Sequence, residues 1–171
     1  MRFSVQVGLV VVAFFAGIGL HYGQVLHKKG STSENFLFVQ TATRGTIDAI
    51  PGQPGNYSLQ LSELNPYVTA FTDRPFRKAK LITTKQFLTD WNHGQDDFSQ
   101  NAPNANLSLV RLVKDAIHPQ DVTLELVNKK YDAKQKSMTY TVHILGADAI
   151  TTPLTFNYAA LFVDGCCCIN C

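Results

Sequence analysis

Hydrophobic and polar residues alternate along much of the chain after residue 35, and this period of two is typical of strands that bury one side. The clearest example is Tyr57, Leu59 and Leu61, which alternate with small polar residues after a proline- and glycine-rich turn. Residues 121–128 and 137–145 alternate in the same way around a lysine-rich connection, which predicts a hairpin with a long or bulged loop. Further strands are expected at 36–42, 45–50, 68–73, 105–113 and 153–164.

One segment carries helix signals instead. Thr83 can cap a helix N-terminus with Gln86 three residues later, and Ile82 and Phe87 form the matching hydrophobic pair. We therefore expect one short helix at 83–92. Together these elements predict a mainly β fold, an antiparallel sandwich or partly open barrel with one helix, preceded by an N-terminal hydrophobic helix.

The N-terminus lacks the alternation. Met1 and Arg2 precede an apolar run, 3–22, that only Ser4 and Gln6 interrupt. A basic start followed by such a run is typical of a signal peptide, and about 20 residues also suffice for an uncleaved membrane anchor. Either alternative places the rest of the chain outside the cytoplasm. The expected organisation is a leader or anchor at 1–23, a linker at 24–35, a β-rich extracytoplasmic domain at 36–165 and a cysteine-rich tail at 166–171.

Charge limits the classes of partner. The formal net charge of +2 falls to −1 once the three basic residues of the leader and linker, Arg2, Lys28 and Lys29, are set aside. A nucleic-acid-binding domain normally has a clear basic excess, so we expect no nucleic-acid partner. The chain contains no G-x-S-x-G, H-E-x-x-H, G-x-G-x-x-G or P-loop pattern, and so no enzyme class is indicated.

The middle of the chain carries a more specific pattern. An alternating strand runs into F-x-D-R-P-x-R-x-A, a short helix ends in Trp-x-x-Gly, and Pro-Asn-Ala-x-Leu opens the next strand. This pattern resembles an uncharacterised group of exported, mostly bacterial β-rich proteins, and the resemblance implies an exported β-rich domain without an assigned activity. The matching residues are Phe71, Asp73, Arg74, Pro75, Arg77, Ala79, Phe87, Trp91, Gly94, Asp96, Phe98, Pro103, Asn104, Ala105 and Leu107.

The segment around Pro75 is a candidate anion site. Arg74 and Arg77 flank this rigid residue, and two guanidinium groups can hold a carboxylate or phosphate. Asp73 favours the structural alternative, in which an acidic side chain caps a tight turn.

Oxygen-bearing side chains near the helix end form a candidate calcium site. Asp90, Asn92, Asp96 and Asp97 are spaced like the start of a calcium-binding loop. The glycine expected at the sixth position is missing, and Asn101 stands where a bidentate glutamate belongs. The alternative is a polar helix exit.

All four cysteines, Cys166, Cys167, Cys168 and Cys171, lie within the last six residues. Outside the cytoplasm disulfides are the expected fate, but bonds between adjacent cysteines are strained. Incomplete internal pairing or a bond to another chain is therefore favoured over two internal bridges. The alternative is a soft metal: copper(I) suits so short a thiolate cluster better than tetrahedral zinc.

The sequence thus predicts an exported, non-enzymatic β domain that acts in envelope or surface interaction and that its C-terminal cysteines could crosslink. The alternative is a small metal-binding or thiol-redox module built on the cysteine cluster. The expected partners are an unidentified protein or a second copy through a disulfide, together with the membrane if residues 3–22 are retained. No cofactor is expected unless copper, zinc or calcium occupies one of the candidate sites.

Overall fold

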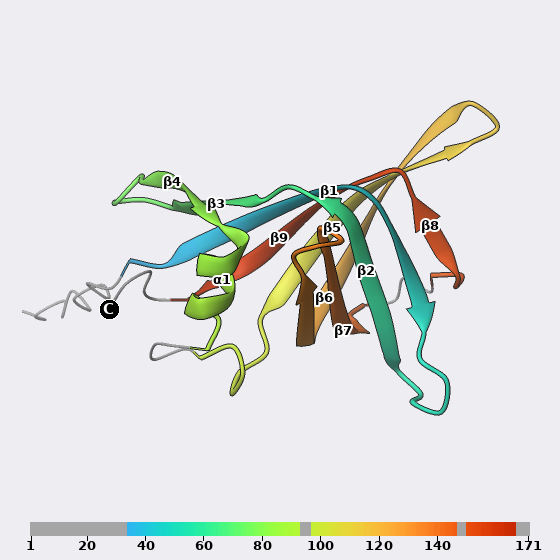
Figure 1. Cartoon of the computed structure of the whole chain (residues 1–171), viewed down its shortest axis with the longest axis horizontal. Coiled ribbons are helices and arrows are strands. Elements are labelled where there is room, and N and C mark those ends of the chain that lie inside the picture. The colour runs from blue at the N-terminus through green and yellow to red at the C-terminus, as the bar shows by residue number, and fades with distance from the viewer. Residues whose placement is uncertain (1–33, 93–96, 147–149, 167–171) are drawn as a thin grey trace, which may run out of the picture. The chain divides into compact units, whose positions relative to one another are not determined.

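The computed structural model describes residues 34–92, 97–146 and 150–166, with the side chain of Cys166 left out. The predicted N-terminal hydrophobic helix lies outside these ranges. None of the helical residues described is part of a segment long and apolar enough to cross a membrane. The described elements are β1 (Phe36–Ala49), β2 (Asn56–Leu64), β3 (Tyr67–Thr72), β4 (Ala79–Thr83), α1 (Thr84–Asp90), β5 (Asn104–Val113), β6 (Ala116–Asp132), β7 (Ser137–Ile144), β8 (Leu154–Phe156) and β9 (Tyr158–Cys166) (Figure 1).

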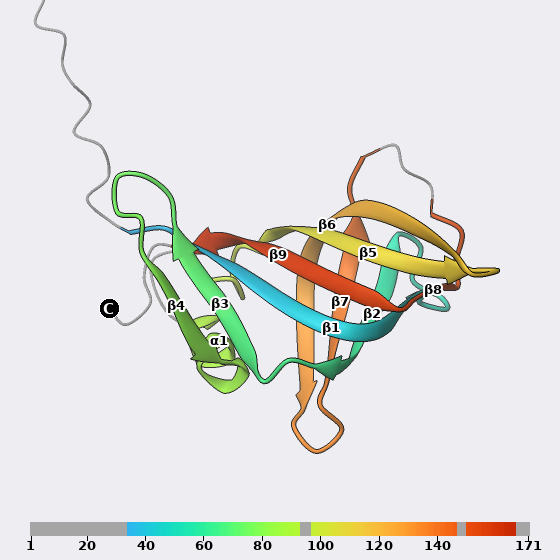
Figure 2. The same ribbon diagram turned by 90° about the horizontal axis from the view of Figure 1, so that it is seen from above.

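The strands pair antiparallel throughout, which confirms the predicted mainly β fold with one short helix. Their order is β2-β7-β6-β5-β9-β1-β3-β4, and a further pairing of β1 with β2 closes a ring of six strands. One wall consists of β5, β9 and β1, and β6, β7 and β2 run across it behind (Figure 2). The two walls therefore enclose a common core, as the layers of a sandwich do.

Strand β1 is the central element because it changes partners along its length. Its first half pairs with β3 at Phe36–Val39, and its second half pairs with β2 at Ala42–Ala49. On its other edge it pairs with β9 and then with β8. The segments 36–42 and 45–50, which the sequence separates, are thus one continuous strand.

The short helix lies where its capping residues predict it. The Thr83 side chain accepts a hydrogen bond from the Gln86 backbone N–H at 3.1 Å, as expected of the cap. Phe87 packs on Phe38 of β1 with ring centroids 5.0 Å apart, and this contact holds the short helix on the sheet. The predicted β6–β7 hairpin is also present, with a register shift between Leu126 and Asn128.

Candidate interaction surface

The most unusual surface is the outer side of five adjacent strands, β5, β9, β1, β3 and β4. Inward residues of these strands are buried in the core, and the alternate residues point outward. We call this outer side the apolar face. On β1 the face includes only the half up to Thr41, and so leaves out the exposed Thr43, Arg44 and Asp48 farther along the strand. Its outward residues are Asn104, Asn106, Ser108, Val110, Leu112, Tyr158, Ala160, Phe162, Asp164, Leu37, Val39, Thr41, Tyr67, Thr69, Phe71, Ala79, Leu81 and Thr83.

Strand register joins these residues into one surface. Phe162 lies opposite Val39, and Val39 lies opposite Thr69, which in turn pairs with Leu81. Neighbouring strands lie about 4.8 Å apart, so such a row presents continuous contact area. Phe162 is 40% exposed and Leu81 69% exposed. Figure 2 looks onto this face, where β9 lies between β5 and β1.

The apolar face has few charged side chains. Asp164 is the only one among the outward positions named above, and Asp121 and Glu125 of β6 lie at its edge, opposite Ser108 and Asn104 of β5. A solvated antiparallel sheet normally alternates an apolar inner side with a polar outer side. The outer side of β2 and β7 follows that rule, with residues Asn56, Ser58, Gln60, Ser62, Thr139, Thr141 and His143. The apolar face differs from that side in its exposed aromatic and aliphatic side chains, and large exposed apolar patches mark interaction sites.

The apolar face was not predicted from the sequence, although the residue pattern of β9 indicates it. In β9 both alternating sets are apolar as far as Val163: Ala159, Leu161 and Val163 are buried in the core, whereas Tyr158, Ala160 and Phe162 point outward. A strand that is apolar on both sides is typical of one covered on both sides.

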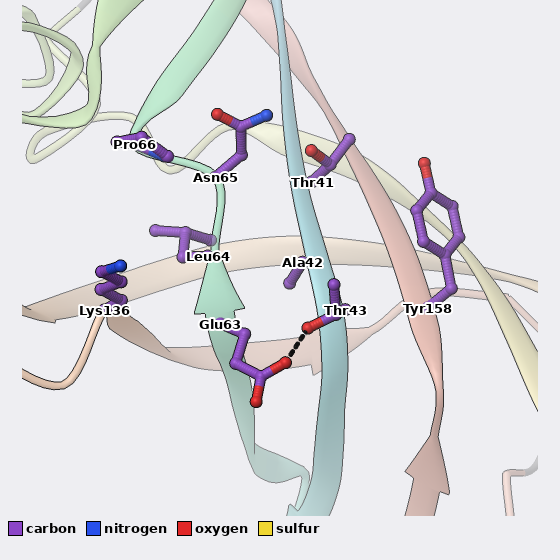
Figure 3. A pocket seen from close by; sticks show the side chains of 9 residues that line it. All are labelled: Thr41, Ala42, Thr43, Glu63, Leu64, Asn65, Pro66, Lys136 and Tyr158. Carbon is purple, nitrogen blue, oxygen red and sulfur yellow. Dashed lines mark hydrogen bonds between the residues drawn. The ribbon is translucent and has the colours of Figure 1, made fainter.

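An open recess lies beside the apolar face where β2 ends and the chain turns into β3 (Figure 3). It measures about 420 Å³, and Tyr158 and Lys136 line opposite sides of it. Its acidic group, Glu63, accepts a hydrogen bond from Thr43 and forms an ion pair with Arg44 at 2.8 Å. These two contacts of Glu63 therefore join the end of β2 to β1 at this corner of the sheet.

The predicted anion site lies in the turn between β3 and β4. The Asp73 side chain accepts the Arg74 backbone N–H at 2.7 Å, and the Asp73 carbonyl accepts that of Arg77 at 3.1 Å. Asp73 therefore caps this tight turn, which is the structural alternative to an anion site. Anion binding by Arg74 and Arg77 stays a prediction.

The residues of the predicted calcium site have separate partners. Asp90 is nearly buried and accepts a hydrogen bond from Gln86 at 2.8 Å, and Asp97 accepts the Ser99 backbone N–H at 2.8 Å. Asp96 lies outside the described residues. Within the ranges described, no group of three or more histidine, cysteine or acidic residues is placed to hold a metal.

Asn92, the fourth member of that predicted site, accepts a hydrogen bond from Lys129 at 3.1 Å. The Lys129 ammonium also lies 4.5 Å from the centroid of the Trp91 ring. Partial burial lowers the pKa of Lys129, and the negative charge of Asp97 opposes that shift. Asn92 and Lys129 thus form a polar cover over the aromatic side chains at this end of the core.

The cysteine tail begins where β9 ends. The backbone of Cys166 pairs with Phe36 at the start of β1, and Cys167, Cys168 and Cys171 lie outside the described residues. Gly165 permits this approach, because a Cβ atom there would lie 1.9 Å from the Phe36 carbonyl oxygen. The disulfide and metal hypotheses for the tail stay predictions.

A buried polar pair crosses the core. The Tyr140 hydroxyl donates a hydrogen bond to the Gln40 side-chain oxygen at 2.9 Å, and both residues are fully buried. Burial raises the pKa of Tyr140 above its usual value of 10.0, and the hydrogen bond to Gln40 opposes that shift. The unfolded phenol thus loses its proton above pH 10, whereas the folded one keeps it. The contribution of Tyr140 to stability is therefore present below pH 10 and is lost as the pH rises above that value.

Tyr140→Phe is expected to lower the free energy of unfolding at neutral pH by about 1–3 kcal/mol, because the buried Gln40 loses its hydrogen-bond partner. The variant should also lose less stability in alkali than the wild type. The pKa of Lys129 shifts in the opposite direction, but Lys129 is present in both proteins. The difference between the two curves of unfolding free energy against pH therefore reports on Tyr140 alone. Urea unfolding from about pH 7 to about pH 11 measures both effects, and parallel curves would contradict this assignment.

Comparisons of the chain with protein-family models, with curated proteins and with solved structures find no match. The features that can support a functional proposal are therefore the chemistry of the apolar face and the basic start and apolar run of the N-terminal sequence.

Proposed function

We propose that this protein is an exported, non-enzymatic β domain that binds a protein partner in the cell envelope or at the cell surface through its apolar face. The observation that carries the proposal is the group of exposed aromatic and aliphatic side chains at outward positions of β3, β4, β5 and β9. Export is supported by the basic start and apolar run at 3–22.

The residue types on the apolar face suit a protein partner. Tyr67, Phe71, Tyr158 and Phe162 place aromatic rings among small polar and aliphatic side chains. Aromatic residues are enriched in the cores of protein interfaces, and charged residues are depleted there. Covering such a surface removes apolar area from water at about 25 cal/mol per Å², which favours association.

Photo-crosslinking tests this surface in intact cells. A photoreactive amino acid replacing Phe162 in the full-length chain is expected to give a discrete protein adduct. Leu81→Lys, on the same row of the apolar face, should reduce the yield by about thirtyfold, because a buried lysine removes about 2 kcal/mol of binding energy.

The matched control places the probe at Thr141 on the polar outer side of β7. That position should give no adduct, and Thr141→Lys should leave the Phe162 adduct unchanged. Equal labelling from both positions, or an adduct that is insensitive to Leu81→Lys, would refute binding through the apolar face.

A further inference from the structure

We infer that a recess between the β5–β6 hairpin and β8 binds a small carboxylate that carries a short apolar group, with Arg111 as the residue that holds the negative charge. This inference goes beyond the proposed function, because the recess and the apolar face lie on opposite sides of β5.

The recess lies on the inner side of the hairpin. Beyond Val110, β5 no longer pairs with β9, and β5 and β6 continue as a two-stranded hairpin. Arg111 follows the buried Leu109 by two residues, and Gln120 lies opposite Leu109 in β6. Because side chains alternate along a strand, Arg111 and Gln120 point to the core side. Strand β8 contacts β5 here, and Figure 2 shows β8 beside the end of β5.

The polar lining of the recess consists of hydrogen-bond donors. Arg111, Gln120, Thr151 and Thr155 line it, and the side chains of all four can donate. The recess measures about 320 Å³, which is at the lower end of the range for small-molecule sites. Its size and its donors therefore suit a small ligand with acceptor oxygens.

The charge of Arg111 is not balanced by the protein. Within the part of the chain that the structure describes, Arg111 takes part in no ion pair, and no acidic residue lines the recess. Asp121 points to the outward side of β6, where it accepts a hydrogen bond from Ser108, and Asp115 lies in the turn between β5 and β6. The guanidinium group can therefore hold a ligand carboxylate with two parallel hydrogen bonds.

The apolar lining narrows the class of anion. Ile150, Pro153 and Leu154 line the recess beside the donors. A carboxylate with a short alkyl chain can place its oxygens at Arg111 and its chain on these three residues, which removes apolar area from water. Phosphate has no apolar part and gains nothing from this contact. The same chemistry has two sources: a free small carboxylate, and the C-terminus of a polypeptide with an apolar last residue.

Titration calorimetry of the purified full-length chain with butyrate tests the site. We expect a dissociation constant of about 1 mM, and at least about tenfold weaker binding of butyramide, the neutral analogue of similar size. Arg111→Gln should weaken butyrate binding by at least about tenfold, because it removes a charge-assisted contact. Arg111→Lys should lose less, since the ammonium group keeps the charge without the planar fork.

Arg77→Gln is the matched control, because it removes the same charge from the exposed turn between β3 and β4. This variant should bind butyrate like the wild type, and thermal unfolding checks that every variant is folded. The site is overturned if butyrate does not bind at about 20 mM, if butyramide binds equally well, or if Arg111→Gln loses no more affinity than Arg77→Gln. Tighter binding of inorganic phosphate than of butyrate overturns the carboxylate class.

A short peptide that ends in valine separates the two sources. If a polypeptide C-terminus is the ligand, the peptide binds at least about tenfold more tightly than butyrate, and amidation of its carboxyl group abolishes binding. If butyrate binds as tightly as the peptide, the ligand is a free small carboxylate. Crosslinking from Phe162 does not involve the recess, so failure of the carboxylate site leaves the proposed function standing.

Discussion

Replacement of Trp91 by alanine is expected to lower the free energy of unfolding by about 3–5 kcal/mol, the range for removing a large buried aromatic side chain. Trp91 follows α1, is only 2% exposed and contacts three aromatic rings. Its ring centroid lies 5.6 Å from that of Phe87, 5.0 Å from that of Phe98 and 6.0 Å from that of Tyr140. It therefore joins the helix and the following loop to the core of the sheet.

This loss is a large part of the total stability, because the free energy of unfolding of a typical domain is only about 5–15 kcal/mol. Urea unfolding followed by circular dichroism measures the loss. Tryptophan fluorescence cannot serve, since Trp91 is the only tryptophan in the chain. Trp91→Phe is the matched control and should lose less, because a smaller ring still fills much of the site. A loss below about 1 kcal/mol for the alanine variant would contradict the proposed joining role.

Gly45→Ala is expected to lower the free energy of unfolding by about 3 kcal/mol through overpacking. Gly45 lies at the middle of β1, opposite both Leu61 of β2 and Phe156 of β8. A Cβ atom there would lie 2.3 Å from the Gln60 carbonyl oxygen and 2.5 Å from the Phe156 ring. The ring can move only into an already filled core, and moving the carbonyl disrupts the β1–β2 ladder.

Thermal and urea unfolding of Gly45→Ala measure this cost. Gly52→Asn is the control, because Gly52 has a φ of 75° with open space around it, and asparagine tolerates that conformation. The control should change stability by less than about 1 kcal/mol. Equal losses in both variants would show that backbone freedom, and not the close approach, explains the glycine at position 45.

The apolar face shows why sequence patterns stop short of the candidate site. Alternation assigned Leu59 and Leu61 to the core correctly, because polar neighbours mark the other side of β2. In β9 the neighbours of Leu161 are apolar as well, so alternation cannot tell the core side from the outer side. Only the pairing of β9 between β5 and β1 shows that Phe162 points away from the core.

The sequence by itself determined the local elements of this protein. Thr83 caps its helix, and alternating residues form the β6–β7 hairpin, because both depend on groups a few residues apart. The tertiary structure alone decided the change of partners along β1, the need for Gly45 and the joining of outward residues from five strands into one face. These features depend on contacts between segments far apart in the chain, and a local pattern of hydrophobicity carries no information about which strands become neighbours.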